Sequence, residues 1–240
     1  MKKLELGYGA GAIAEYPWHR DGTRPWMNED STRARECIKL LPSLGIKFAD
    51  TAFRYGNGTS EIILGSELGQ ESEVRVITKV NMRHLISDAQ TSFLRLGFSL
   101  SGILLHDPDF GLPWEVHAAC EELKRLCYPY SGISTEPSED ARRFFEDHKL
   151  NTIEFPFSPS DLRAEQVLKP WLIDRPDILR IANRVLGGPG PKDPVTVRLG
   201  LEFVWRNRDW IDVALIGTTN PEHLRECADI VKELNERIEK

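Results

Sequence analysis

Four residues with chemically active side chains end or follow consecutive apolar segments of this sequence. Asp50 ends the segment IKFAD, Tyr55 follows it five residues later, Lys79 lies near the end of VRVITKV, and His106 lies near the end of SGILLHD. Taken singly, each residue has an ordinary structural explanation. Asp50 could be a turn residue, Tyr55 an aromatic at the rim, Lys79 a charge that reaches water, and His106 a histidine bonded to backbone. If the segments are neighbouring strands, however, the four side chains meet at one edge. Burying them together is costly unless they pair, so the set predicts a functional site.

These four residue types fit one kind of chemistry. Asp50 can hold Lys79 as an ion pair, and the ammonium group can lower the pKa of Tyr55 from its ordinary value of about 10 by stabilising the phenolate. Such a tyrosine can act as the general acid for a carbonyl that is reduced to an alcohol. His106 can donate a hydrogen bond to the same carbonyl oxygen. None of the four supplies a hydride, so this interpretation requires a nicotinamide cofactor.

The segments that carry these residues belong to an alternation of strand-like and helix-like patterns. We expect strands at residues 4–9, 46–50, 74–80, 101–107, 128–133, 152–157, 178–183 and 212–218. We expect helices at residues 31–44, 60–68, 88–96, 113–126, 138–148, 163–172, 195–205 and 221–234. Units of about 30 residues are typical of a (β/α)8 TIM barrel, an α/β fold whose active site forms at the C-terminal strand ends.

A doubly wound open sheet is the competing architecture. The sequence has no Gly-x-Gly-x-x-Gly turn after its first predicted strand and no break in composition between its halves. We therefore favour a barrel formed as a single domain by residues 1–240.

The composition indicates a protein that acts on small molecules. The net charge is −6, with 40% hydrophobic and 28% charged residues. Acidic and basic residues are mixed along the chain, so no basic stripe predicts nucleic-acid binding. No apolar run approaches the roughly 18 residues that span a bilayer, and the opening MKKLELGYGAG lacks a secretory core, so we predict no membrane partner and a cytoplasmic location. The four cysteines are spaced as packing residues, and we predict no metal site.

Four segments of the sequence resemble those of a known enzyme family. DTAFRYGNGTSEIILG, VITKV, LLHDPD and LIGTTNPEHLREC resemble, in this order, segments of the aldo-keto reductases. The resemblance implies that Tyr55 is the proton donor, that Lys79 and Asp50 tune it, and that His106 orients the substrate. It also implies NADPH as the hydride source and an aldehyde or ketone as the substrate.

One predicted cofactor segment lies at the start of the last helix. Small residues and backbone donors at a helix N-terminus suit a phosphate group. By the resemblance, this segment binds the adenosine phosphate of the cofactor through Gly217, Thr218, Thr219, Asn220 and His223. Many relatives carry basic residues where this chain has Gly217 and His223, so NADH is not excluded as the cofactor.

A second predicted cofactor region follows the fifth, sixth and seventh strands. The resemblance places Ser134, Thr135 and Glu154 beside the nicotinamide, with Leu186 and Gly188 close to the cofactor backbone. The family has Asn and Gln where this chain has Thr135 and Glu154, and a Glu donates a hydrogen bond only when protonated. NRVLGGPG continues directly into PKDP without the long segment that usually covers the pyrophosphate. We therefore interpret the chain as a short-chain variant with loosened cofactor binding.

Several alternatives stay open at the level of the sequence. Trp18, His19 and Trp26 could line a pocket for an apolar or cyclic carbonyl substrate, or they could simply pack in their loop. The barrel could also serve as a nucleotide-sensing regulatory or binding module with weak or no turnover. A hydrolase or lyase that uses Asp50 and His106 has no second positioned carboxylate to support it. The oligomeric state, a monomer or a weak dimer, cannot be read from the sequence.

Overall fold

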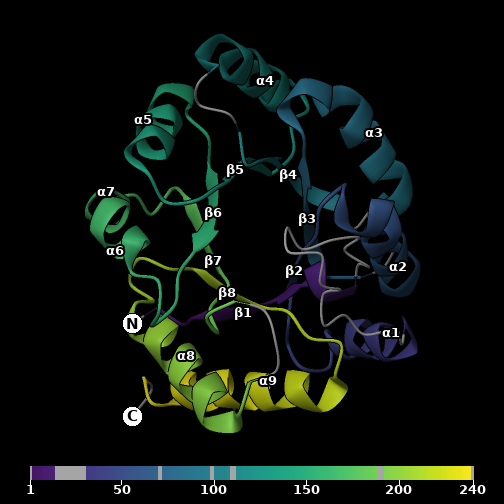
Figure 1. The fold of residues 1–240 in the computed structure, drawn as a ribbon. Coiled ribbons are helices and arrows are strands. Elements are labelled where there is room, and N and C mark those ends of the chain that lie inside the picture. Colours follow the sequence, from purple (N-terminus) through teal and green to yellow (C-terminus); the bar gives the residue numbers. More distant parts are fainter. Residues whose placement is uncertain are drawn as a thin grey trace, which may run out of the picture.

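Eight parallel strands close into a barrel in the computed structural model, which describes residues 2–13, 31–69, 72–97, 100–108, 112–188 and 192–238. The strands are β1 (Glu5–Gly9), β2 (Phe48–Asp50), β3 (Arg75–Val80), β4 (Leu100–His106), β5 (Tyr130–Ser134), β6 (Thr152–Pro156), β7 (Leu179–Asn183) and β8 (Val213–Ile216). Each strand pairs with the next along the chain, and β8 returns to pair with β1 (Figure 1). The predicted TIM barrel is confirmed, and an open sheet is excluded.

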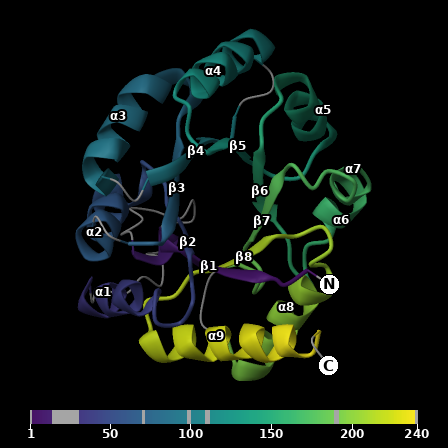
Figure 2. The ribbon, with the colours of Figure 1, turned by 180° about the vertical axis from the view of Figure 1, so that it is seen from behind.

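Helices surround the barrel as an outer ring, as both faces of the molecule show (Figures 1 and 2). The α-helices are α1 (Ser31–Leu40), α2 (Thr59–Leu68), α3 (Leu85–Leu96), α4 (Pro113–Arg125), α5 (Glu139–His148), α6 (Arg163–Val167), α7 (Lys169–Leu172), α8 (Pro194–Arg206) and α9 (Pro221–Glu236). Short 3-10 helices are η1 (Ala10–Ile13), η2 (Tyr55–Gly58) and η3 (Met82–His84). In the part of the chain that the structure describes, none of the helices combines the length and apolar character needed to cross a membrane.

Strand alternation divides the apolar residues between two cores. Side chains of alternate residues point to opposite faces of a strand. One set fills the barrel itself and comprises Phe48, Ile77, Leu104, Ile181, Val213 and Leu215. The other set, which includes Ala49 and Val76, faces outward and packs with the helices in a larger core. The barrel interior is therefore closed by side chains, and only the strand ends are available for chemistry.

Capping residues define where several helices begin. Ser138 accepts a hydrogen bond from the backbone N–H of Ala141 at the start of α5. Asn220 accepts one from Glu222 at the start of α9, where Pro221 occupies the first turn. These contacts satisfy donors that have no partner within a helix. The predicted cap at Asn220 is confirmed.

Three predicted helices differ from the observed ones. The helix predicted over residues 31–44 ends at Leu40, because Pro42 has no N–H group to continue the helical hydrogen bonds. α3 begins at Leu85 instead of residue 88, and the Asp88 carboxylate accepts a hydrogen bond from the backbone N–H of Asn81. The helix predicted over residues 163–172 is two short helices, α6 and α7, which meet at Leu168. Pro170 has no N–H group to donate to the preceding turn, so it interrupts the α-helical hydrogen bonds there.

The motif SEIILG positions α2 against its neighbours. Glu61 is fully buried, and its carboxylate accepts hydrogen bonds from Thr78 (2.6 Å), Ser92 (2.6 Å) and Arg95 (2.9 Å). A Cβ atom on Gly65 would lie 2.1 Å from the backbone oxygen of Arg95. Glycine at this position therefore permits the close approach of α2 to α3, and Glu61 connects both helices to β3.

The cysteines are only in part the packing residues that their spacing predicts. Cys37, Cys120 and Cys227 are buried, and burial raises the pKa of each thiol to about 12. Cys127 is exposed instead, in the turn after α4, with a left-handed φ of 55°. The prediction was wrong for Cys127, because its side chain is exposed in this turn rather than packed against the helices.

Candidate active site

Three of the predicted catalytic residues lie on the inner face of the barrel at its C-terminal end. Asp50, Lys79 and His106 lie on β2, β3 and β4, each two residues after a side chain of the barrel interior. Because strand side chains alternate, residues at this spacing share one face. The same rule places Ser134, Glu154 and Asn183 on the inner face of β5, β6 and β7. The strands thus bring six polar side chains to one end of the barrel.

Lys79 lies at the centre of this arrangement and is only 1% exposed. Its ammonium group forms an ion pair with the Asp50 carboxylate and donates a hydrogen bond to the backbone oxygen of Thr51 at 3.0 Å. A second carboxylate lies close, because Glu154 Oε1 is 3.4 Å from Lys79 Nζ. The predicted pairing of Asp50 with Lys79 is present, and Glu154 adds a partner that the sequence did not assign to this role.

The three buried charges do not balance. Burial and the neighbouring Glu154 carboxyl group raise the pKa of Asp50 well above its usual range, although Lys79 acts in the opposite direction. Burial disfavours the charged form of Lys79, yet Asp50, Glu154 and Tyr55 outweigh it and raise the pKa of Lys79. Lys79 is therefore held as an ammonium ion. Two carboxyl groups facing one ammonium ion favour retaining a proton between them.

Hydrogen bonding supports this shared proton. Asp50 Oδ1 and Glu154 Oε2 are both buried without a donor among the described residues. A contact between the two carboxyl groups is among the causes that raise the pKa of Asp50. Two ionised carboxylates cannot hydrogen-bond to each other, whereas a carboxylic acid can donate to a carboxylate. A proton retained on Asp50 would thus allow the two carboxyl groups to hydrogen-bond to each other.

Tyr55 begins η2 and lies between Lys79 and His106. Lys79 Nζ is 5.3 Å from the centroid of the Tyr55 ring, and the rings of Tyr55 and His106 meet edge to face at 5.9 Å between centroids. Tyr55 is half-buried, and the His106 side chain is 11% exposed. The turn after β2 therefore brings the phenol into contact with residues of β3 and β4, as the sequence predicts.

His106 is a neutral imidazole in this environment. Burial lowers its pKa to about 2, and the positive charges of Lys79 and Arg54 add to the effect. Its Nδ1 atom is buried without a partner among the described residues, and Nε2 lies 3.8 Å from the exposed carboxylate of Asp107. A neutral imidazole can donate one hydrogen bond to a substrate oxygen, but it is a poor proton donor near neutral pH.

Two of the predicted nicotinamide residues, Ser134 and Thr135, hydrogen-bond to the third, Glu154. Ser134 Oγ and Asn183 Nδ2 donate to Glu154 Oε1 at 3.2 and 2.7 Å, and the backbone N–H of Thr135 donates to the Glu154 backbone oxygen at 3.0 Å. Asn183 Oδ1 is buried and accepts no hydrogen bond from the described residues. Sequence reasoning missed Asn183, although its position two residues after the inward-facing Ile181 was a readable signal.

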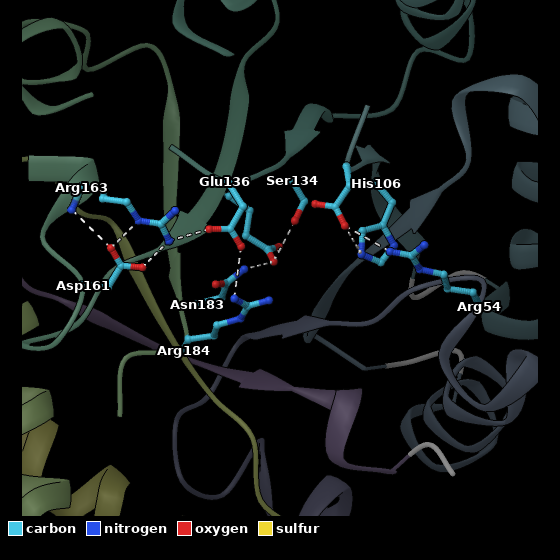
Figure 3. A network of polar contacts seen from close by, with 10 residues as sticks. Arg54, His106, Ser134, Glu136, Asp161, Arg163, Asn183 and Arg184 are labelled. Carbon is cyan, nitrogen blue, oxygen red and sulfur yellow. Dashed lines mark hydrogen bonds and ion pairs between the residues drawn. The ribbon is translucent and has the colours of Figure 1, made fainter. Parts of the chain in front are cut away.

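Outside this buried group, charged residues form a rim over the strand ends. Arg54 pairs with Asp107 at 3.1 Å. Glu136 accepts from Arg163 at 2.6 Å and from Arg184 at 3.1 Å, and Figure 3 shows its carboxylate pointing toward both guanidinium groups. All five residues are at least partly exposed, so their ion pairs contribute little to stability and can exchange for other anions.

The remaining predicted cofactor residues lie on the turns after β7 and β8. Leu186 and Gly188 follow β7, where Gly188 has a φ of 94° that favours glycine. Gly217 is exposed after β8, and the Thr218 side chain accepts from the backbone N–H of Asn220 at 3.0 Å.

Thr219 precedes the cap of α9, and His223 is exposed in its first turn. The hydroxyl of Tyr8 on β1 donates to the backbone oxygen of Thr218 at 2.8 Å, which fixes the turn after β8 against the barrel. The predicted aromatic pocket residues Trp18, His19 and Trp26 lie outside the described residues.

Comparison with known proteins agrees with this arrangement. The model of the aldo/keto reductase family matches residues 5–190. This range contains the turn after β7 and the tetrad, by which we mean Asp50, Tyr55, Lys79 and His106. The chain belongs to the aldo/keto reductase family. The curated aldo-keto reductase YhdN from Bacillus subtilis is 27% identical over 191 residues, which cover 71% of this chain and 57% of that protein.

A second curated relative comes from Schizosaccharomyces pombe. It bears the name of a voltage-gated potassium channel β-subunit and is 32% identical over 105 residues, which cover 36% of this chain and 30% of the relative. The chain thus spans between about a third and somewhat over half of the length of these curated relatives.

Solved aldo-keto reductases share the fold over nearly the whole chain. The holo form of AKR11C1 from Bacillus halodurans has a TM-score of 0.76 at 18% identity, covering 100% of this chain and 95% of that one. An aldo-keto reductase from Klebsiella pneumoniae, solved in complex with NADPH, has a TM-score of 0.73 at 20% identity, covering 97% and 90%. At these identities the likeness establishes the barrel fold.

Proposed function

We propose that this aldo/keto reductase reduces an aldehyde or ketone to an alcohol with NADPH or NADH as the hydride source and Tyr55 as the proton donor. The observation that carries the proposal is the fully buried Lys79, which is held by Asp50 and lies 5.3 Å from the centroid of the Tyr55 ring. An ammonium ion in a site of low polarity stabilises a neighbouring phenolate. This is the property that a tyrosine acid needs if its proton is to leave near neutral pH.

Each residue has a separate role in this proposal. A nicotinamide cofactor, when bound, would supply the hydride for the carbonyl carbon. Tyr55 transfers its phenolic proton to the carbonyl oxygen, so the products are the alcohol and a phenolate that regains a proton from solvent. His106, neutral at its low pKa of about 2, orients the carbonyl by donating a hydrogen bond. Asp50 and Lys79 hold the positive charge beside Tyr55.

The residues at the strand ends fit a nicotinamide group. Its carboxamide offers N–H donors, and the unpartnered Asn183 Oδ1 and Glu154 Oε2 are acceptors on the inner face of the barrel. Ser134 and Thr135 hold Glu154 in place through its side chain and backbone.

The turn after β8 fits the adenosine phosphate. A Cβ atom on Gly217 would lie 3.3 Å from the backbone oxygen of Gly9, so only a small residue fits without displacement. The segment leads into α9, a helix of 16 residues whose N-terminus favours an anion. We place Thr218, Thr219, Asn220 and His223 at this phosphate, with Leu186 and Gly188 toward the pyrophosphate.

A titration with NADPH and with NADH, followed by tryptophan fluorescence, tests the cofactor assignment. Binding of at least one nucleotide, together with nucleotide oxidation in the presence of an aromatic or aliphatic aldehyde, is the expected result. Absence of binding by both nucleotides would refute the proposal. Tight binding without turnover on a panel of aldehydes and ketones would favour the nucleotide-sensing module instead.

A further inference from the structure

Two histidines and a glutamate converge on the outer surface of the barrel, away from the tetrad. His117 and Glu121 lie one turn apart on α4, and His148 is the last residue of α5. One ligand atom from each lies within 4.8 Å of the other two, and the rings of His117 and His148 are 4.9 Å apart. Figure 1 shows α4 and α5 as neighbours in the outer ring.

We infer that these three side chains form a binding site for a divalent transition metal of the Zn²⁺ class. Two imidazoles and a carboxylate are the donors that such ions prefer, with water able to complete the coordination. Ligand atoms about 2.0–2.2 Å from a tetrahedral ion lie roughly 3.3–3.6 Å from one another. The present ligand atoms lie within 4.8 Å of one another, so His117 and Glu121 would need to move closer to His148 around an ion.

The packing of these residues prepares them for binding. The His148 side chain is largely buried, and its ring packs on Phe144 at 4.4 Å between centroids, so its orientation is fixed by the α5 core contact. His117 is exposed and Glu121 is half-buried. One ligand is therefore held by the fold, and the other two can adjust around the ion.

Lys124 is the group that opposes binding. Its ammonium donates to Glu121 Oε1 at 2.6 Å, which leaves Oε2 for a metal but places a positive charge beside the site. Removing this charge should strengthen metal binding. The ion pair therefore gives the proposal a test in which affinity increases, which unfolding or damage to the site cannot imitate.

The position of the site indicates a structural role. Helices run back along a barrel after each strand, so the end of α5 lies at the end of the barrel opposite the C-terminal strand ends. A metal here would join α4 to α5 without contacting the tetrad. It should stabilise the folded chain by binding to it preferentially and leave the turnover rate unchanged.

Calorimetric titration with ZnCl₂ tests the proposal on protein freed of any affinity tag. We expect one Zn²⁺ per chain for the original protein, affinity reduced by at least about tenfold for His117→Ala and for Glu121→Gln, and increased affinity for Lys124→Ala. His84→Ala is the matched control, because His84 is an exposed histidine on η3 outside the cluster. The Zn²⁺ affinity of this variant should equal that of the original protein.

A second readout separates this site from other Zn²⁺ ligands. Zn²⁺ should raise the melting temperature of the original protein and of His84→Ala, and should fail to do so for His117→Ala. Cys127→Ser should bind as the original protein does, because the exposed thiol is not part of the site. Absence of binding, an undiminished affinity in His117→Ala, or a loss of binding in Cys127→Ser would each overturn the proposal.

Discussion

Replacing Glu154 by Gln should make the protein more stable, relative to the original, as the pH rises. The carboxyl pair of Asp50 and Glu154 faces a single ammonium ion, and both groups are almost completely buried. The amide introduced by Glu154→Gln would keep an oxygen that accepts from Ser134 and Asn183, while its nitrogen could donate to the unpartnered Asp50 Oδ1. The substitution removes one buried charge and preserves the shape of the site.

The structure sets the size of the effect. At the 3.4 Å between Lys79 Nζ and Glu154 Oε1, an effective dielectric constant of about 20 gives an attraction of about 5 kcal/mol. Repulsion between the ionised Asp50 and Glu154 is of comparable size and opposite sign, so the two terms nearly cancel. The cost of desolvating a second buried carboxylate, on the order of several kcal/mol, is then not offset.

The direction follows from proton linkage. The folded-state pKa of Asp50 is raised, so the carboxyl pair binds a proton more tightly when folded than when unfolded. Its contribution to stability is full below the unfolded carboxyl pKa of about 4 and is lost as the pH rises through the folded value. The loss is about 1.4 kcal/mol per pH unit until that value is passed. Glu154→Gln should therefore lose much less stability than the original protein as the pH rises.

Urea unfolding followed by tryptophan fluorescence at several pH values from 5 to 8 measures this difference. The free energy of unfolding of Glu154→Gln relative to the original protein should increase with pH, with a slope of up to about 1.4 kcal/mol per pH unit. Glu61→Gln is the matched control, because Glu61 is equally buried but balances Arg95 and should destabilise the protein at every pH. A difference for Glu154→Gln that is constant with pH, or that decreases, would refute the shared proton.

Three other predictions test separate parts of the structure. The original protein should lose about 1.4 kcal/mol of stability per pH unit below pH 6.5, because the unfolded chain binds a proton at His106 that the folded chain, with a pKa of about 2, does not bind. His106→Gln should not show this loss, and unfolding free energies that fall equally with pH in both proteins would contradict the prediction. Gly65→Ala should lower the free energy of unfolding by about 1–3 kcal/mol, because the added methyl group clashes with the Arg95 backbone. A melting temperature equal to that of the exposed control Gln90→Ala would contradict this clash between α2 and α3. Glu154→Gln should also bind NADPH about five- to tenfold more tightly, because a Gln amide can donate to the carboxamide without a bound proton; unchanged or weaker binding in a fluorescence titration would place the nicotinamide elsewhere.

The barrel could be predicted from the sequence because each unit carries a local signal. Apolar alternation marks the strands, helical spacing marks the outer ring, and Asn220 with Pro221 marks the start of α9. The tetrad could be predicted for the same reason, since Asp50, Lys79 and His106 lie at fixed positions on neighbouring strands. Errors arose where a single residue overrides the pattern, as Pro170 does between α6 and α7.

The charge balance of the site could not be predicted from the sequence. Glu154 stands out in the sequence only as a departure from the family's Gln, and its contact with Lys79 depends on how β6 is placed opposite β3. Asn183 reaches the same carboxylate from β7. Similarly, His117, Glu121 and His148 have no motif in common, and only the packing of α4 against α5 brings them together.

Replacing Tyr55 by Phe tests the proposed catalytic role of Tyr55. Steady-state reduction of an aldehyde by NADPH should be abolished in Tyr55→Phe, since the phenolic proton is lost, while the NADPH affinity measured by tryptophan fluorescence stays the same. Turnover by Tyr55→Phe at the rate of the original protein would contradict the role of Tyr55 as the proton donor.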